Sequence, residues 1–341
     1  MTTPSLDFAA VGGLSIAVAA ALLLTTRVPF DRSAPPLVAY LLTACVVWPH
    51  FLASYRLLYA TRESVLRYRS ASIHFPLALL AVGAFAVVRA ETTPAYVNFL
   101  SLVAAVYLAR HYTGQAWGMM ASFSLVEGRA FSPREREVCR ASLDLLMVWQ
   151  ATWALAIGVG GVVPSLESVA RRIDAHVDAI AVVSFVVGLV GLGMNARRLG
   201  AAPGVRVVVP WLALYFWYAL MRRDVGNLLV VQVAHALQYL VFPLRIEQTR
   251  ASGGSGPIRP RFAALWLAAL ALASVACFAG IPELFRVSYG DAGGAGETSA
   301  AFFSVFVSVV NVHHYFIDGC LYKLRNPEVR RDLFAHLAPV T

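Results

Sequence analysis

The segment PLVAYLLTACVVWPHFLASYRL, residues 36–57, decides the fold class of this chain. It is long enough to cross the core of a bilayer, which requires roughly 20 apolar residues in a helix. The run also contains an imidazole, His50, six positions before Arg56. An ionisable side chain inside hydrocarbon is costly and usually serves a function. The segment therefore predicts a membrane-spanning helix that carries a functional histidine.

The composition extends this prediction to the whole chain. Of its 341 residues, 59% are hydrophobic and 14% are charged, whereas soluble domains carry roughly 25% charged residues. We expect an all-α polytopic transmembrane helix bundle over residues 1–325, with a cytoplasmic tail over 326–341. About ten spans are expected, at 8–26, 36–57, 74–91, 95–122, 138–162, 177–195, 206–221, 225–245, 261–280 and 299–320.

The basic residues predict the orientation of these spans. Nineteen follow even-numbered spans and eight lie on the other side. Because cytoplasmic loops are rich in Lys and Arg, both termini are expected in the cytoplasm, with the chain in a bacterial-type inner (plasma) membrane. The net charge of +9 is then explained by basic loop residues that orient the helices in the membrane. Membrane lipids are the expected surroundings, nucleic acid is not an expected partner, and no protein partner is indicated.

The four cysteines favour neither a zinc ribbon nor a disulfide framework, because they are far apart and form no CxxC pair.

Four histidines share one predicted depth. They lie on the second, fourth, eighth and tenth spans, in the inner half of the membrane, and they are His50, His111, His235 and His314. Each has a hydrogen-bonding residue four positions later, on the same helix face. These partners are Ser54, Gln115, Tyr239 and Asp318. Imidazoles that bind a metal usually give their other N–H to such a group. The pattern predicts a metal centre.

The expected ligands are these four histidines together with the neighbouring His313, although Asp318 shares a face with His314 and favours the latter. We expect Asp318, Tyr239 and Asp144 to orient ligands or take part in catalysis. Gln115 and Gln238 are expected beside the cofactor. Imidazoles with one or two carboxylates suit non-haem iron with open positions for dioxygen.

Three other interpretations stay open at this point. An intramembrane histidine often only links helices by hydrogen bonds, as in a scaffold or assembly factor. Pairs of histidines can be the axial ligands of a haem. Histidines and a carboxylate can also relay protons in a proton-coupled transporter.

The histidine-bearing segments resemble the Brp/Blh family of bacterial membrane carotene dioxygenases. The matching pieces are WPHFLASY (48–55), ARHYTGQAWG (109–118) and VAHALQY (233–239). Phe51 stands where the family has Gly, and Tyr239 where it has a second histidine. The resemblance implies intramembrane histidines that hold a non-haem iron and cleave β-carotene to retinal.

Together, the residues and the resemblance predict an integral-membrane, metal-dependent oxidoreductase of the oxygenase type. Its substrate would be lipophilic, such as a carotenoid, an isoprenoid or a lipid. Haem is the alternative cofactor.

Overall fold

The computed structural model describes residues 2–25, 28–253, 256–289, 295–324, 326–335 and 337. Within those ranges the regular secondary structure is all helical. The helices are α1 (Pro4–Phe8), α2 (Leu14–Thr25), α3 (Phe30–Ser33), α4 (Pro36–Leu42), α5 (Trp48–Tyr59), α6 (Arg62–Arg67), α7 (Phe75–Val88), α8 (Ala95–Val126), α9 (Pro133–Gly158), α10 (Glu167–Asp174), α11 (Asp178–Leu199), α12 (Val205–Arg223), α13 (Leu228–Ser252), α14 (Pro260–Phe278), α15 (Gly280–Tyr289), α16 (Ala295–Leu321) and α17 (Pro327–Phe334). Wider π-helical turns join some of them, as η1 (Ala9–Gly13), η2 (Thr43–Val47) and η3 (Ser70–His74), and tighter 3₁₀ turns join others, as η4 (Val159–Gly161), η5 (Pro164–Leu166) and η6 (Val225–Asn227).

Eight helical stretches in the described part of the chain are long and apolar enough to cross a membrane. They are Pro4–Thr25, Pro36–Tyr59, Ser70–Val88, Pro133–Gly161, Asp178–Leu199, Val225–Ser252, Pro260–Ser288 and Thr298–Leu321. Such a set is that of a multi-pass membrane protein, because each stretch reaches the length of a bilayer core.

The number of candidate spans is therefore eight, whereas the sequence predicted about ten. The two remaining predicted spans, 95–122 and 206–221, do form helices, as α8 and α12. Both helices pack inside the bundle: α8 contacts α7, α9, α12 and α16. Interior helices can carry polar side chains such as His111 and Gln115, because neighbouring helices and not lipid surround them.

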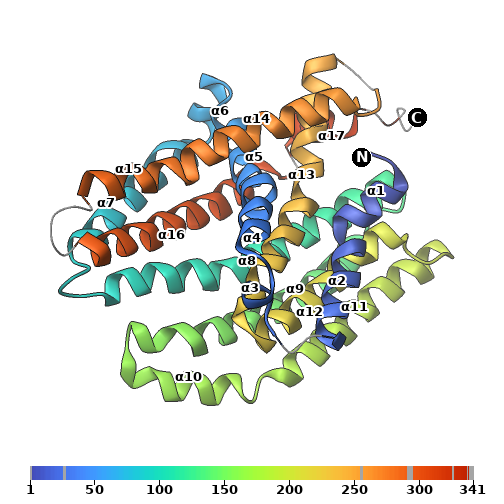
Figure 1. Cartoon of the computed structure of the whole chain (residues 1–341). Coiled ribbons are helices and arrows are strands. Elements are labelled where there is room, and N and C mark those ends of the chain that lie inside the picture. Colours follow the sequence, from blue (N-terminus) through green and yellow to red (C-terminus); the bar gives the residue numbers. More distant parts are fainter. Residues whose placement is uncertain are drawn as a thin grey trace.

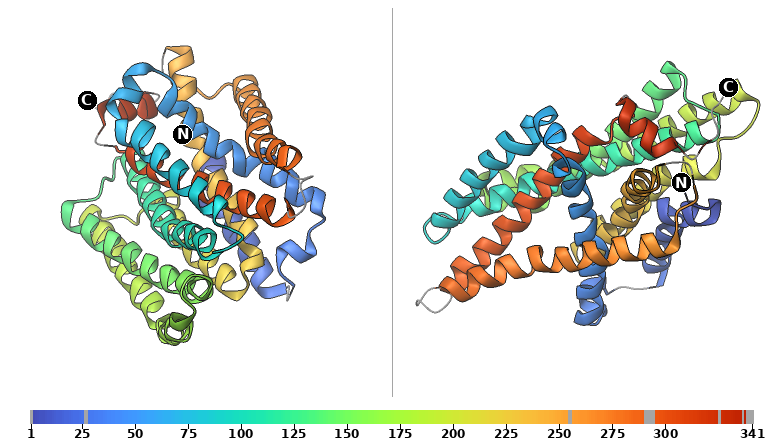
Figure 2. Two further views of the ribbon diagram at one scale, coloured as in Figure 1. Left: turned by 90° about the vertical axis from the view of Figure 1, so that its left-hand side faces the viewer. Right: turned by 90° about the horizontal axis from the view of Figure 1, so that it is seen from above.

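The helices form one bundle in which not all axes are parallel. Figures 1 and 2 show α4 and α5 crossing α14 and α16 steeply, while α9 and α11 lie side by side at another edge. The central α8 packs between these two groups. The crossing brings α5, α13, α8 and α16, which carry the four predicted histidines, to a common region.

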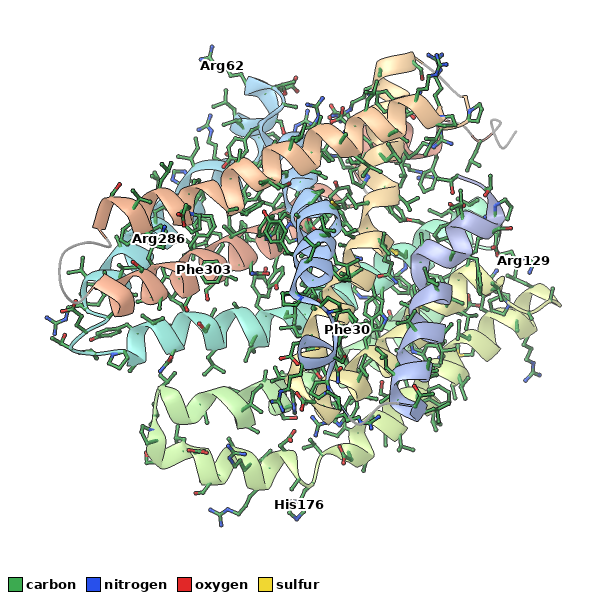
Figure 3. The ribbon with its side chains drawn as sticks, viewed as in Figure 1. Phe30, Arg62, Arg129, His176, Arg286 and Phe303 are labelled. Carbon is green, nitrogen blue, oxygen red and sulfur yellow. The ribbon has the colours of Figure 1, made fainter. Side chains whose placement is uncertain are left out.

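Residues from both predicted sides of the membrane lie at the edges of the molecule. In Figure 3, Arg62 and Arg129 lie at the upper and right edges of the molecule, and His176 and Arg286 at the lower and left edges. The first pair belongs to the predicted cytoplasmic side and the second pair to the opposite side. Which side of a membrane each edge faces stays a prediction, as does the position of the termini.

The tail predicted over 326–341 begins with a helix. α17 packs on α13, and Arg250 on α13 forms an ion pair of 2.8 Å with Asp332. Residues 336 and 338–341 lie outside the described residues. The described part of the tail is thus attached to the bundle.

Candidate metal centre

Four histidines from four helices converge in the interior of the bundle. His50 comes from α5, His111 from α8, His235 from α13 and His314 from α16. All four are buried, and one ring nitrogen from each lies within 4.8 Å of those of the others. This buried cluster, named here the histidine cluster, can hold a metal ion.

The imidazole rings are arranged as a closed ring of four. His314 lies 4.4 Å and His235 5.0 Å from His50, measured between ring centroids. On the far side, His111 lies 4.7 Å from His235 and 5.0 Å from His314. His111 Nε2 and His235 Nε2 approach to 3.0 Å. Each ring therefore borders two others around a shared centre.

The helix that carries His50 also sets the proton position on its ring. The turn η2 directly precedes Trp48, and Pro49, which has no backbone N–H, occupies the first turn of α5. His50 Nδ1 lies 2.8 Å from the carbonyl oxygen of Val47. A carbonyl only accepts, so Nδ1 donates the hydrogen bond and Nε2 keeps its lone pair. The buried Nε2 has no hydrogen-bond partner among the described residues, and a lone pair in this state suits a metal.

A carboxylate borders the histidine cluster on one side. Asp318 Oδ2 lies 3.3 Å from His314 Nε2 and 4.0 Å from His111 Nε2. Its other oxygen, Oδ1, accepts hydrogen bonds from the hydroxyls of Ser54 at 2.6 Å and Tyr239 at 3.1 Å. Two hydroxyl donors thus hold the carboxylate so that its second oxygen faces the imidazoles.

Unsatisfied polar atoms are concentrated here. Of twelve buried side-chain nitrogen and oxygen atoms that lack a hydrogen bond in the described part of the chain, six belong to this region. They are His50 Nε2, Gln115 Oε1, His235 Nδ1, His314 Nδ1, His314 Nε2 and Asp318 Oδ2. Leaving such an atom unpaired costs about 1–3 kcal/mol. A bound cation would satisfy several of these atoms at once.

The spacing fits a single ion after a small contraction. Bonds from a metal ion such as zinc to imidazole nitrogen are about 2.0–2.1 Å, so two nitrogens bound to one ion lie at most roughly 4.2 Å apart. The widest separation in the histidine cluster is within 4.8 Å. Each ring nitrogen therefore needs to move toward the centre by less than about 1 Å, which side-chain rotation provides.

Two predicted site residues are not brought to the histidine cluster. His313 bonds to Tyr55 through Nδ1 at 3.0 Å and to the Ala71 carbonyl through Nε2 at 2.7 Å. Successive residues on a helix diverge by about 100°, and His314 takes the inward direction. Asp144 is exposed on α9, because the neighbouring Ser142 and Leu143 face the core.

The two predicted glutamines lie beside the histidine cluster and support its backbone. Gln115 Nε2 donates to Gln238 Oε1 at 3.0 Å and to the His235 carbonyl at 3.3 Å. Gln238 Nε2 in turn donates to the Val11 carbonyl at 2.6 Å. They tie α8, α13 and the N-terminal stretch together next to His235.

Two residues that the sequence did not single out border the histidine cluster. A cavity of about 10 Å³ touches His50 and His235, and two residues with carboxamide side chains, Gln232 and Asn311, also line it. Both carboxamides stand three positions before a histidine of the cluster, at His235 and His314. The three-residue spacing could have identified these two residues from the sequence, just as the four-residue spacing identified the partners of the histidines.

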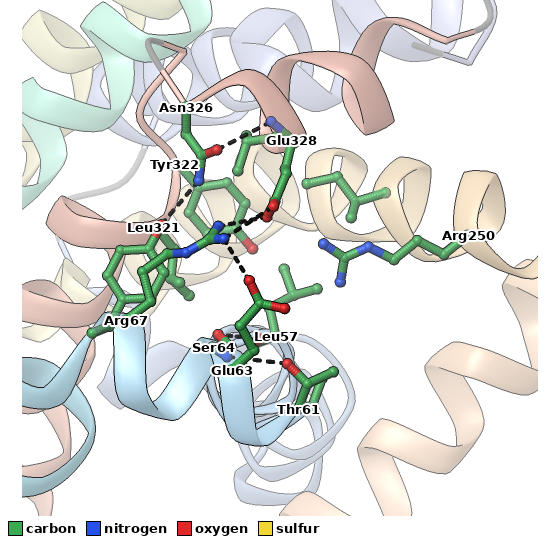
Figure 4. Close-up of a pocket in the computed structure, with 14 residues that line it drawn as sticks. Leu57, Thr61, Glu63, Ser64, Arg67, Arg250, Leu321, Tyr322, Asn326 and Glu328 are labelled. Atoms are coloured by element: carbon green, nitrogen blue, oxygen red, sulfur yellow. Dashed lines mark hydrogen bonds and ion pairs between the residues drawn. The ribbon is translucent and has the colours of Figure 1, made fainter.

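A larger pocket of about 290 Å³ lies at the end of the bundle where α6 and α17 meet. Figure 4 shows Arg67 in it between Glu63 and Glu328, at 2.8 and 2.6 Å. The Arg67 guanidinium holds the pKa of the Glu328 carboxyl below its usual range. Tyr322 lines this pocket, and its ring centroid lies 5.1 Å from that of Tyr239. None of the four histidines lines the pocket.

Comparison of the chain with family models, with curated proteins and with solved structures gives no match.

Proposed function

We propose that this protein is an integral-membrane oxidoreductase that uses a non-haem iron ion held by the histidine cluster. The reaction class is oxygenation of a lipophilic substrate, such as a carotenoid, an isoprenoid or a lipid. One observation carries the proposal: four histidines from four helices place ring nitrogens within 4.8 Å of one another inside an apolar bundle. A purely structural role would need each imidazole to be paired with neighbouring groups, yet His50 Nε2 and His314 Nδ1 make no hydrogen bond within the described residues.

The donor set favours iron. Neutral imidazoles suit zinc, copper, iron and nickel, while a carboxylate beside them and open positions are typical of non-haem iron in oxygenases. Asp318 supplies the carboxylate, with Oδ2 at 3.3 Å from His314 Nε2. Iron in such a site supplies the one-electron and dioxygen chemistry that protein side chains lack.

The ring spacing favours an ion over haem. A haem with two histidine ligands has the whole macrocycle between the two imidazoles. Here the neighbouring rings are 4.4–5.0 Å apart, and the cavity that touches them is about 10 Å³. A porphyrin does not fit between these rings without separation of the helices.

The surrounding side chains have separate roles in this proposal. The Ser54 and Tyr239 hydroxyls hold Asp318 Oδ1, so that Oδ2 stays directed at the imidazoles. Tyr239 OH also lies 2.6 Å from Ser54 Oγ, so these hydroxyls can hold a proton next to the carboxylate. Phe51 packs against His314 at 4.8 Å between ring centroids and keeps water from that side.

Support for a lipophilic substrate comes from the setting. Three of the four histidines lie on helices long and apolar enough to span a membrane, and Phe278 on α14 packs against Phe51 at 5.8 Å. A substrate that approaches from the lipid meets aromatic and aliphatic side chains before it meets the imidazoles. Polar substrates would have to lose their hydration to follow the same route.

Metal analysis of the purified full-length protein tests the metal centre. We expect about one ion per chain, because a site whose ligands are held in place by hydrogen bonds binds metal strongly. His235→Ala and His314→Ala should lose most of it, and His313→Ala, whose ring bonds elsewhere, should keep it. Equal metal content in all three variants would contradict the proposal.

Expression in a host that accumulates β-carotene tests the substrate class. Loss of pigment with the parent chain, but not with His314→Ala, is the result expected for a carotenoid substrate. Stoichiometric iron without any loss of pigment would remove carotenoids from the proposal and direct the search to other isoprenoids and lipids.

A further inference from the structure

The small cavity beside the histidine cluster is lined by residues that precede the histidines by three positions, about one helical turn. On α13 and α16, Gln232 and Asn311 stand three positions before His235 and His314. Tyr239 and Asp318 stand four positions after the same histidines, on the other side of the imidazole layer. On η2 and α5, Val47, His50 and Ser54 repeat this order. The cavity and the Asp318 carboxylate therefore lie on opposite sides of the cluster.

The size of the cavity limits what it can hold. Its volume is about 10 Å³, and a cavity needs at least about 10–15 Å³ to hold one water molecule. It thus admits a ligand of the size of water or of a diatomic molecule, and excludes any organic substrate. The imidazoles of His50 and His235 form part of its wall.

The polar groups of the cavity are of two kinds. Asn311 is held in place, because its Nδ2 donates to the Val307 carbonyl at 2.8 Å and its Oδ1 accepts from Tyr315 OH at 2.8 Å. Gln232 is half-buried, and its carboxamide makes no hydrogen bond within the part of the chain that the structure describes. A carboxamide offers both a donor and an acceptor, so Gln232 can bind a small ligand of either polarity.

We propose that this cavity is the position of a water-sized exogenous ligand of the metal, such as a diatomic gas, and that Gln232 holds that ligand by a hydrogen bond. This inference rests on the proposed metal centre. Asp318 closes the opposite face, so the centre has a carboxylate side and a small-ligand side. Val47 sets the volume available on the small-ligand side, since it lines the cavity and is buried.

Nitric oxide is the probe that tests the site. The full-length protein is loaded with ferrous iron under anaerobic conditions, its iron content is measured, and nitric oxide is titrated while the EPR signal of the iron–nitrosyl is followed. Val47→Ile adds one methylene to the cavity wall and should weaken nitric oxide binding roughly tenfold or more, because overpacking a filled site is destabilising. Val46→Ile, one position away and outside the lining, is the matched control.

A second variant tests the hydrogen bond. Gln232→Leu keeps the approximate size and should weaken the binding roughly two- to tenfold, the usual range for one hydrogen bond. Gln150→Leu, a buried glutamine on α9, is its control. Iron content should stay at the parent level in all four variants.

The outcomes separate this inference from the proposed function. A parent protein without stoichiometric iron would contradict the metal centre itself. A parent protein that holds iron but binds no nitric oxide would overturn only the small-ligand site. So would nitric oxide affinity unchanged in both Val47→Ile and Gln232→Leu.

Discussion

At the scale of single residues, hydrogen bonds from the same helix or from a neighbouring helix fix the orientation of the donors. The Val47 carbonyl fixes the proton of His50 on Nδ1, and the hydroxyls of Ser54 and Tyr239 fix Asp318 through Oδ1. Such supporting contacts raise metal affinity because the donors do not have to be ordered when the ion binds. They also explain why these hydroxyls lie deep in an apolar bundle.

Removal of one supporting hydroxyl should therefore weaken metal binding without abolishing it. Tyr239→Phe leaves Asp318 with Ser54 as its only hydroxyl donor, and we expect metal affinity to fall about tenfold or more. Tyr55→Phe removes a hydroxyl of the same kind that bonds to His313, outside the histidine cluster. Competition with a chelator measures both. A similar affinity in the two variants would exclude the supporting role of Tyr239.

The spacing of residues in the sequence predicted much at this scale. The four histidines do meet, and Tyr239 and Asp318 lie beside them. The spacing could not decide where a side chain points when its neighbour is also polar. His313 bonds instead to Tyr55 and Ala71, and Asp144 is exposed. These outcomes depend on the rotation of α16 and α9 within the bundle, which follows from the packing of all the helices.

At the scale of elements, glycines determine how closely two helices approach. In α11, a Cβ atom on Gly191 would lie 2.6 Å from Cys139 Sγ and 3.1 Å from the Cys139 backbone nitrogen on α9. A Cβ atom on Gly193, two residues later, meets nothing within 4 Å. Close packing through small residues is a common device of membrane helices.

The α9–α11 pair gives a prediction with a control in the same helix. Gly191→Leu should destabilise the fold by roughly 1–3 kcal/mol or more, as overpacking of a filled interface does, while Gly193→Leu should have little effect. Thermal unfolding in detergent measures the difference. Equal unfolding temperatures for the two variants would mean that α9 and α11 do not pack as described.

Hydropathy predicted the positions of the helices well, but it predicted less well how many of them are candidate membrane spans. Every predicted span lies on a helix, yet α8 and α12 are not among the eight stretches that are long and apolar enough to cross a membrane. Hydropathy measures suitability for lipid, whereas these two helices are covered mainly by protein: α12 buries Trp211, Trp217 and Tyr218. Helix-to-helix contacts of this kind are not visible in the local sequence.

At the scale of the whole molecule, the arrangement of basic residues predicts a single orientation in the membrane. α7 connects a basic end, with Arg62 on α6, to a turn that contains Thr92. If α7 crosses the bilayer, these two positions lie on opposite sides, with Arg62 in the cytoplasm.

Cysteine labelling in intact cells and in inverted vesicles tests this orientation. With the four native cysteines replaced, Arg62→Cys should react with an impermeant reagent only in inverted vesicles, and Thr92→Cys only in intact cells. Labelling of both positions from one side would show that α7 does not cross the membrane. Labelling with the sides exchanged would reverse the orientation and leave the bundle and the histidine cluster as described.

X-ray absorption at the metal edge of the purified protein tests the central claim most directly. We predict a first shell of nitrogen and oxygen at about 2.0–2.2 Å, with the outer-shell scattering that several imidazoles produce and a loss of part of that scattering in His314→Ala. A protein that contains no stoichiometric metal, or a metal without imidazole scattering, would contradict the account.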